Sequence, residues 1–164
     1  MTDNISFSLK LRPLNSEEII LIKHLWIELY REQKESNPSL RLDPYGFSAW
    51  KDSIENIVGR FGFIIAAVVN SYPAGFVAGR IKIPTPPFRS EPVGFISELF
   101  VISDQRGKGL GKMLLRAAEE WFTDNDVNFM ELQVLTRNSA AKAFYSNQGW
   151  LSTVEHMEKS IQRP

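Results

Sequence analysis

The stretch Gln105-Arg106-Gly107-Lys108-Gly109-Leu110-Gly111-Lys112 lies between an apolar, strand-like segment at 95–102 and an amphipathic helix that begins near Leu110. Glycines at every second position let the backbone turn tightly and approach a ligand closely. The N-terminus of the following helix presents unpaired N–H groups and a partial positive charge. The sequence therefore predicts a phosphate-binding turn between a strand and a helix.

Two other glycine-rich motifs fit this stretch less well. Lys112 is followed by Met113, so the Gly-Lys-Ser/Thr ending that holds magnesium in a nucleotide-hydrolysing P-loop is missing. The Gly-x-Gly-x-Gly spacing, two-thirds of the way along the chain, differs from the early Gly-x-Gly-x-x-Gly of a dinucleotide fold. A plain strand-to-helix turn with capping glycines remains the alternative interpretation.

A second motif follows at 138–150, Asn-Ser-Ala-Ala-Lys-Ala-Phe-Tyr-Ser-Asn-Gln-Gly-Trp, after a strand-like segment at 130–135. Together the two motifs resemble the GNAT family of acyl-CoA-dependent N-acetyltransferases. The family's Arg/Gln-x-x-Gly-x-Gly/Ala signature falls on Arg106, Gly109 and Gly111. Its Asn-x-x-Ala…Tyr-x-x-x-Gly-Phe/Trp pattern falls on Asn138, Ala141, Tyr145, Gly149 and Trp150. Two motifs in this order are far more specific than either alone.

The resemblance implies a mixed α/β fold, with a central, mostly antiparallel sheet of about seven strands flanked by about four helices. The implied order is β-α-α-β-β-β-α-β-α-β, as a single domain over residues 1–164. Hydrophobic periodicity agrees with this order. It predicts strands at 5–11, 61–69, 74–83, 95–102 and 130–135, helices at 15–31, 43–58, 110–122 and 140–147, and a final strand or two within 151–161.

Composition limits the classes of function. The chain has 164 residues, 43% of them apolar, which suits one compact domain. Lysine plus arginine equals aspartate plus glutamate at 19 each, so no overall charge favours nucleic acid or a membrane surface as a partner. Without cysteine there is neither a disulfide nor a thiolate metal site, and no metal is expected. Without a signal-like N-terminus or a long apolar run, a cytoplasmic protein is the default expectation.

The resemblance implies acetyl-CoA as the acyl donor. Its pantetheine arm is expected to pair with main-chain atoms of Leu99, Phe100 and Val101, as an added strand would. Its pyrophosphate is expected at the glycine turn, in contact with Arg106, Gly107, Lys108, Gly109, Leu110, Gly111 and Lys112. Asn138 is expected to cap the following helix and to contact the pantetheine arm, and Lys142 to meet a phosphate. Helix capping alone and a solvated lysine are the alternatives.

Two residues are candidates for the proton transfers. An acceptor amine arrives as ammonium, with a pKa of about 10.4, and needs a base near neutral pH. Glu98 lies where many family members carry such a base, although several place it one residue earlier, where this chain has Ser97. An exposed strand carboxylate or an ion pair is the alternative for Glu98. Tyr145 is expected to donate a proton to the departing thiolate, and a buried aromatic with no catalytic role is its alternative.

The acceptor is less well determined by the sequence. Carboxylates and aromatic residues suit a cationic amine, and the expected acceptor cleft contains several of both. These residues are Glu28, Tyr30, Glu32, Glu35, Asp43, Tyr45 and Phe88, the last followed by Arg89. Ordinary charge on the surface of helices is the alternative interpretation. A small-molecule amine, a protein N-terminus or lysine, and a non-catalytic acyl-CoA sensor all remain open, for a monomer or a homodimer.

Overall fold

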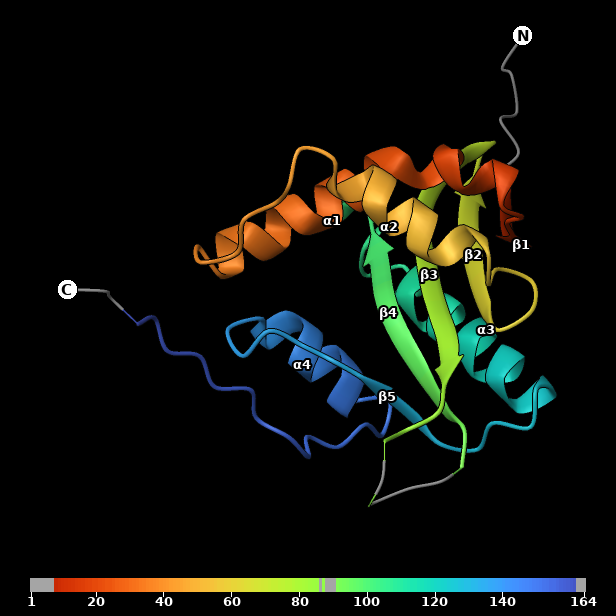
Figure 1. Cartoon of the computed structure of the whole chain (residues 1–164). Helices are drawn as coiled ribbons and strands as arrows, with labels where there is room; N and C mark the ends of the chain where they lie inside the picture. The colour runs from red at the N-terminus through yellow and green to blue at the C-terminus, as the bar shows by residue number, and fades with distance from the viewer. Residues whose placement is uncertain (1–7, 86, 88–90, 162–164) are drawn as a thin grey trace, which may run out of the picture. The chain divides into compact units, whose positions relative to one another are not determined.

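The computed structural model describes residues 8–85, 87 and 91–161, and Figure 1 traces the chain from red at the N-terminus to blue at the C-terminus. The chain forms two compact units, Met1–Gln133 and Val134–Pro164. The first unit contains the sheet and most of the helices. The second contains α4 (Ser139–Ser146) followed by an irregular segment. The two motifs therefore lie in different units.

The first unit is built on a sheet that has five strands over the described residues, in the spatial order β1-β2-β3-β4-β5. Neighbouring strands are antiparallel except β4 and β5, which are parallel. The strands are β1 (Leu9–Pro13), β2 (Gly62–Val69), β3 (Tyr72–Lys82), β4 (Val93–Val101) and β5 (Met130–Leu132). Asn70 and Ser71, both at positive φ, form the two-residue turn between β2 and β3.

Helices cover both faces of this sheet (Figure 1). One face carries α1 (Lys23–Ser36) and α2 (Gly46–Glu55), and the other carries α3 (Leu110–Asp124). Two 3-10 helices, η1 (Glu17–Ile22) and η2 (Ser103–Gln105), precede α1 and α3. Fully buried residues such as Leu25 of α1 and Phe76 of β3 form the core on the α1–α2 face.

The first helical segment begins with a capping box formed by Asn15 and Glu18. Asn15 Oδ1 accepts hydrogen bonds from the backbone N–H groups of Glu17 and Glu18, both at 3.0 Å. Glu18 Oε2 accepts from the N–H of Asn15 at 3.1 Å. This reciprocal arrangement satisfies donors that the helix itself leaves unpaired. The first turns form η1 before the chain continues into α1.

A β-bulge at Ser97 changes the face to which β4 presents its side chains. Ala78 and Gly79 are consecutive on β3, but they pair with Glu98 and Ile96, so Ser97 is the extra residue. Ala78 belongs to the core under α1 and α2, whereas Gly79 lies on the α3 side. The bulge therefore turns Glu98 toward α1 and α2.

The ladder between β4 and β5 ends where the bulge begins. Its last pair is Ile96 with Leu132, although β4 continues to Val101. The chain after β5 soon turns, with the Asn138 N–H donating to the Leu135 carbonyl at 2.8 Å. The strand predicted at 130–135 is therefore shorter than expected, and the edge of β4 beyond Ile96 is not paired with any described strand.

The predicted final strand or two within 151–161 is wrong, and with it the expected count of about seven strands. These residues are exposed and irregular, and the observed order ends with α4. The apolar residues at this end, Leu151, Val154, Met157 and Ile161, are three or four positions apart. A strand alternates its faces every residue, so this spacing does not give one buried face. In the described part of the chain, no helix is long and apolar enough to cross a membrane.

Candidate functional site

The carboxylate of Glu98 is the central feature of the candidate site. Glu98 is 6% exposed, and no other charged residue among those described is as deeply buried. The alternative of an exposed strand carboxylate is therefore wrong. None of the ion pairs within 4.0 Å between described residues includes Glu98. A buried carboxylate without a paired cation must be stabilised by hydrogen bonds.

Three side chains supply these hydrogen bonds. The Tyr30 hydroxyl on α1 and the Trp50 indole N–H on α2 both donate to Glu98 Oε1, at 2.9 and 3.0 Å. The Ser97 hydroxyl, from the bulge itself, donates to Glu98 Oε2 at 2.5 Å. Tyr30 was expected in the acceptor cleft, and the structure brings it together with the expected base. Trp50 was not predicted, because nothing in its helical pattern distinguishes it from a core residue.

The surroundings of Glu98 shift its protonation equilibrium. Burial raises the pKa of Glu98 above its ordinary value, while the hydrogen bonds from Ser97, Tyr30 and Trp50 and the charge of Arg80 lower it in part. Burial and the neighbouring carboxylate raise the pKa of Tyr30 well above its usual range, so its hydroxyl remains a donor. A carboxyl group whose pKa is raised toward neutrality is better matched to taking a proton near pH 7.

Aromatic packing holds the two donors in place. The Trp26 ring lies 4.3 Å from the Tyr30 ring and 6.0 Å from the Trp50 ring, measured between centroids. The Phe47 ring packs against Trp50 at 5.8 Å. The Trp26 indole N–H is buried and has no hydrogen-bond partner among the described residues. This cluster holds Tyr30 and Trp50 in the positions from which they donate to the carboxylate.

The unpaired edge of β4 lies next to Glu98 in the sequence. The Ile102 N–H donates to the Ala74 carbonyl of β3 at 2.9 Å. Hydrogen-bonding direction alternates along a strand, so the groups of Leu99 and Val101 point to the opposite edge. One of them, the Val101 carbonyl, accepts from Arg106 Nε at 2.8 Å. In the part of the chain that the structure describes, the N–H and C=O of Leu99 and the N–H of Val101 point to an edge that no strand pairs, where the pantetheine arm was predicted.

The glycine turn has the expected backbone conformation. Gly107 and Gly109 have φ values of +73° and +87°, and a Cβ added to either would meet no atom within 4 Å. Gly109 is the N-cap residue of α3, whose first intrahelical bond runs from the Met113 N–H to the Gly109 carbonyl at 3.0 Å. The N–H groups of Leu110, Gly111 and Lys112 precede that bond, so they have no partner within the helix, and this is where the sequence predicted the pyrophosphate.

Arg106 makes contacts that sequence reasoning did not foresee. Its guanidinium donates to both carboxylate oxygens of Glu32 on α1, at 2.7 and 2.9 Å, as well as to Val101. It also lies over the Phe100 ring, 5.3 Å from the centroid. The side chain thus ties the end of β4 to α1, while the main chain of Arg106 leads into the turn. Lys108 and Lys112 are exposed.

The second unit contains the other motif, and its residues support one another locally. Asn138 Oδ1 accepts from the Ala141 N–H at 3.0 Å, which confirms the predicted cap of α4. Gly149 has a φ of +86°, and the chain beyond it places the Trp150 ring 5.9 Å from the ring of Tyr145. Burial raises the pKa of Tyr145 to about 12, so its hydroxyl is protonated at neutral pH. Lys142 is exposed.

Glu28, also predicted to bind the acceptor, is not part of the hydrogen-bonded group around Glu98. Glu28 precedes Tyr30 by two residues, which places it about 200° around the helix from Tyr30. Phe88 lies outside the described residues.

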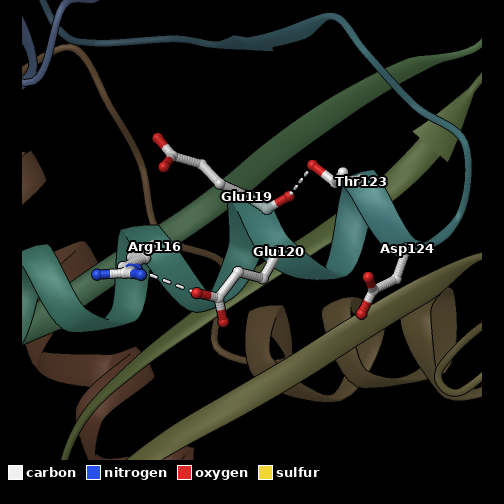
Figure 2. A pocket seen from close by; sticks show the side chains of 5 residues that line it. All are labelled: Arg116, Glu119, Glu120, Thr123 and Asp124. Atoms are coloured by element: carbon white, nitrogen blue, oxygen red, sulfur yellow. Dashed lines mark hydrogen bonds and ion pairs between the residues drawn. The ribbon is translucent and has the colours of Figure 1, made fainter.

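A depression of about 300 Å³ on the outer surface of α3 is a separate feature. Figure 2 shows its lining, Arg116, Glu119, Glu120, Thr123 and Asp124. Arg116 is occupied by an ion pair with Glu120 at 3.0 Å, and this surface does not include any predicted site residue. Among the described residues, no group of three or more His, Asp or Glu side chains could hold a metal ion.

Comparison with known proteins gives one consistent result. A model of the Acetyltransferase (GNAT) family matches residues 24–150. An uncharacterized N-acetyltransferase of Archaeoglobus fulgidus is 25% identical over 140 residues, which cover 85% of this chain and 91% of that protein. The uncharacterized N-acetyltransferase YobR of Bacillus subtilis is 36% identical over 63 residues, 38% of this chain but only 26% of YobR.

Two solved structures share the fold. The aminoglycoside N-acetyltransferase AAC(6')-Iy in complex with CoA superimposes with a TM-score of 0.73 at 18% identity, over 96% of this chain and 97% of that one. A mutant of the BH1408 protein from Bacillus halodurans gives a TM-score of 0.79 at 18% identity, over 93% of this chain and 99% of that one.

Proposed function

This chain belongs to the GNAT family of acetyl-CoA-dependent N-acetyltransferases, and from that premise we propose that it acetylates a primary amine of a small molecule, with Glu98 as base and Tyr145 as acid. The observation that carries the proposal is the buried Glu98 carboxylate, held by Tyr30 and Trp50 beside the unpaired edge of β4. A base that takes a proton from the acceptor ammonium lowers the cost of amine attack, and the buried carboxylate of Glu98 suits that role.

The proton balance assigns one step to each residue. Glu98 takes a proton from the acceptor ammonium, and the neutral nitrogen forms the new bond to the acetyl carbon. The bond between that carbon and sulfur breaks, and Tyr145 gives its proton to the thiolate. The nitrogen, positively charged after the attack, loses its second proton, which restores the Tyr145 hydroxyl, and Glu98 releases its proton to solvent. The role of Tyr145 rests on its place in the second motif and on its protonated state at neutral pH.

The residues around the donor site fit the chemistry of CoA. The N–H and C=O groups of Leu99 and the N–H of Val101 suit the amides of a pantetheine arm. The backbone amides at 107–112, at the N-terminus of α3, suit a pyrophosphate. We further propose that both units act as one catalytic domain, which is supported by a family match that spans them.

The acceptor proposal draws on the relatives. AAC(6')-Iy, which has the same fold, is an aminoglycoside acetyltransferase and has been solved with a bisubstrate analogue of CoA and acetylneamine. A small-molecule amine is therefore favoured over a protein N-terminus or lysine. A non-catalytic acyl-CoA sensor would need neither Glu98 nor Tyr145.

The test is thiol release from acetyl-CoA in the presence of a broad panel of amines. Tyr145→Phe should lower turnover about 10²-fold or more while CoA affinity, measured by calorimetry, stays nearly unchanged. Tyr72→Phe, which removes an exposed hydroxyl on β3, is the matched control. Full turnover by Tyr145→Phe would contradict the acid role. A wild type that binds acetyl-CoA but acetylates no amine would favour the sensor.

A further inference from the structure

The face of the sheet that carries Glu98 continues toward two cations. Arg80 is two residues beyond Ala78 on β3, so it lies on the same face, about 7 Å further along the strand. Phe95 pairs with Arg80 across the two strands. The Arg80 guanidinium lies 5.7 Å from the centroid of the Phe95 ring, and Lys82 Nζ lies 4.4 Å from it. Two positive charges therefore lie close to one ring on the face of the sheet that carries Glu98.

The two cations differ in their partners. Lys82 forms an ion pair with Glu131 of β5. Arg80 forms no ion pair within 4.0 Å with any described carboxylate. Its charge is nevertheless felt at Glu98, whose pKa it lowers against the effect of burial. Arg80 is thus an exposed guanidinium on the face of the sheet that carries Glu98, and among the described residues no carboxylate pairs with it.

Arg80 also lines a cavity that is otherwise mostly apolar. The cavity has a volume of about 660 Å³ and lies where β3 ends and β4 begins. Its other lining residues are Ser53, Ile57, Phe61, Ile81, Ile83, Pro92, Asn125 and Val127. A cavity of this size accommodates a small organic ligand. Its apolar wall favours an apolar group, and its guanidinium favours an anion beside that group.

We propose that Arg80 binds a carboxylate of the acceptor, so that the preferred acceptor is a zwitterionic amine with an apolar side chain, such as an apolar amino acid. The amine reaches Glu98, the carboxylate pairs with the guanidinium of Arg80, and the side chain enters the cavity. This inference rests on the proposed function and specifies its substrate class. A polycationic amine would place further positive charges next to Arg80 and Lys82, which is unfavourable.

The kinetic test compares L-leucine with L-leucinamide, which lacks the negative charge. Arg80→Gln should lower kcat/KM for L-leucine about tenfold or more, and should change kcat/KM for L-leucinamide less than about twofold. Because the two amines differ in basicity, the decisive quantity is the change in their ratio between wild type and variant. If Arg80 acted only through Glu98, the variant would affect both acceptors alike, and the inference would be overturned.

Arg116→Gln is the matched control, because Arg116 lies on the outer surface of α3 and pairs there with Glu120. Arg116→Gln should leave the ratio of kcat/KM for L-leucine to kcat/KM for L-leucinamide unchanged. A wild type that acetylates kanamycin or spermidine but neither leucine compound would overturn the inference while the proposed function stands. If no amine is acetylated, the proposed function fails separately.

A binding measurement tests whether Arg80 binds a carboxylate even if no amine is acetylated. N-acetyl-L-leucine and N-acetyl-L-leucinamide carry no amine and differ in the carboxylate alone. With CoA present, calorimetry should show the wild type binding the anionic compound about tenfold or more tightly than the neutral one, and Arg80→Gln should abolish this preference. Equal affinities in the wild type would overturn the inference.

Discussion

Glu98 is buried and accepts hydrogen bonds, most of which a glutamine, its neutral isostere, can also accept. Glu98→Gln retains an oxygen for Tyr30 and Trp50 but cannot take a proton. We expect turnover to fall about 10²-fold or more at neutral pH and to recover partly as pH rises, because solution then supplies the neutral amine. The pH dependence of kcat/KM checks this. An equal loss at every pH would indicate a role in acceptor positioning.

Trp50 allows the pKa of the base to be tested directly. Its indole N–H stabilises the charged form of Glu98, so Trp50→Phe should raise the pKa of Glu98 further. The acidic limb of the kcat/KM profile should then move to higher pH. Trp121→Phe is the control, because Trp121 packs on Phe63 at 4.7 Å on the α3 face. A limb that moves in both variants, or in neither, would argue against Glu98 as the titrating group.

At the level of elements, the glycine turn can be tested against a matched glycine. Gly109→Val adds a side chain at a φ of +87°, and Gly59→Val does so at +83°, in both cases with no atom within 4 Å of the new Cβ. Both variants should lose about 1–3 kcal/mol of stability from backbone strain. Gly109→Val alone should weaken CoA binding strongly, as calorimetry can measure. Similar CoA affinity in the two variants would remove the turn from the donor site.

The elements also show how far sequence patterns reach. The glycine turn, the Asn138 cap and the helices around them depend on local chemistry, and the sequence predicted them. The bulge at Ser97 does not depend on local chemistry alone, because it is defined by the pairing of β4 with β3. The alternation of side chains along a strand did not decide on which face of the sheet Glu98 lies. The extra residue, Ser97, turns the Glu98 carboxylate toward α1 and α2. The β4–β5 ladder ends at Ile96, the residue before this bulge.

On the scale of the whole molecule, the environment of Glu98 is assembled from distant parts of the chain. Tyr30 and Trp50 are 68 and 48 residues away from Glu98 in sequence. The family motif indicated the carboxylate of Glu98 as the base. Tyr30 was indicated only as an aromatic residue suited to binding a cationic acceptor. No local signal connects Trp50 or Arg80 to the base, because their proximity depends on the packing of α2 and on the register of β3 with β4.

The same carboxylate should make the stability of the whole fold depend on pH. Because the pKa of Glu98 is raised in the folded state, the folded chain holds a proton that the unfolded chain releases. Below the pKa of Glu98 in the unfolded chain, about 4.5, its contribution to the stability of the fold is therefore fully present. This contribution is lost as pH rises through the higher pKa that Glu98 has in the folded chain. Glu98→Gln stays neutral and avoids this loss.

We therefore expect the melting temperature of Glu98→Gln, relative to the wild type, to be higher at pH 7 than at pH 4. Thermal unfolding at the two pH values, with Glu131→Gln as the control for a partly exposed strand carboxylate, measures the difference. A gap between variant and wild type that does not change with pH would mean that Glu98 is not destabilised by burial. A gap that widens toward neutral pH would show that this carboxylate is retained at a cost in stability, as expected of a group kept for catalysis.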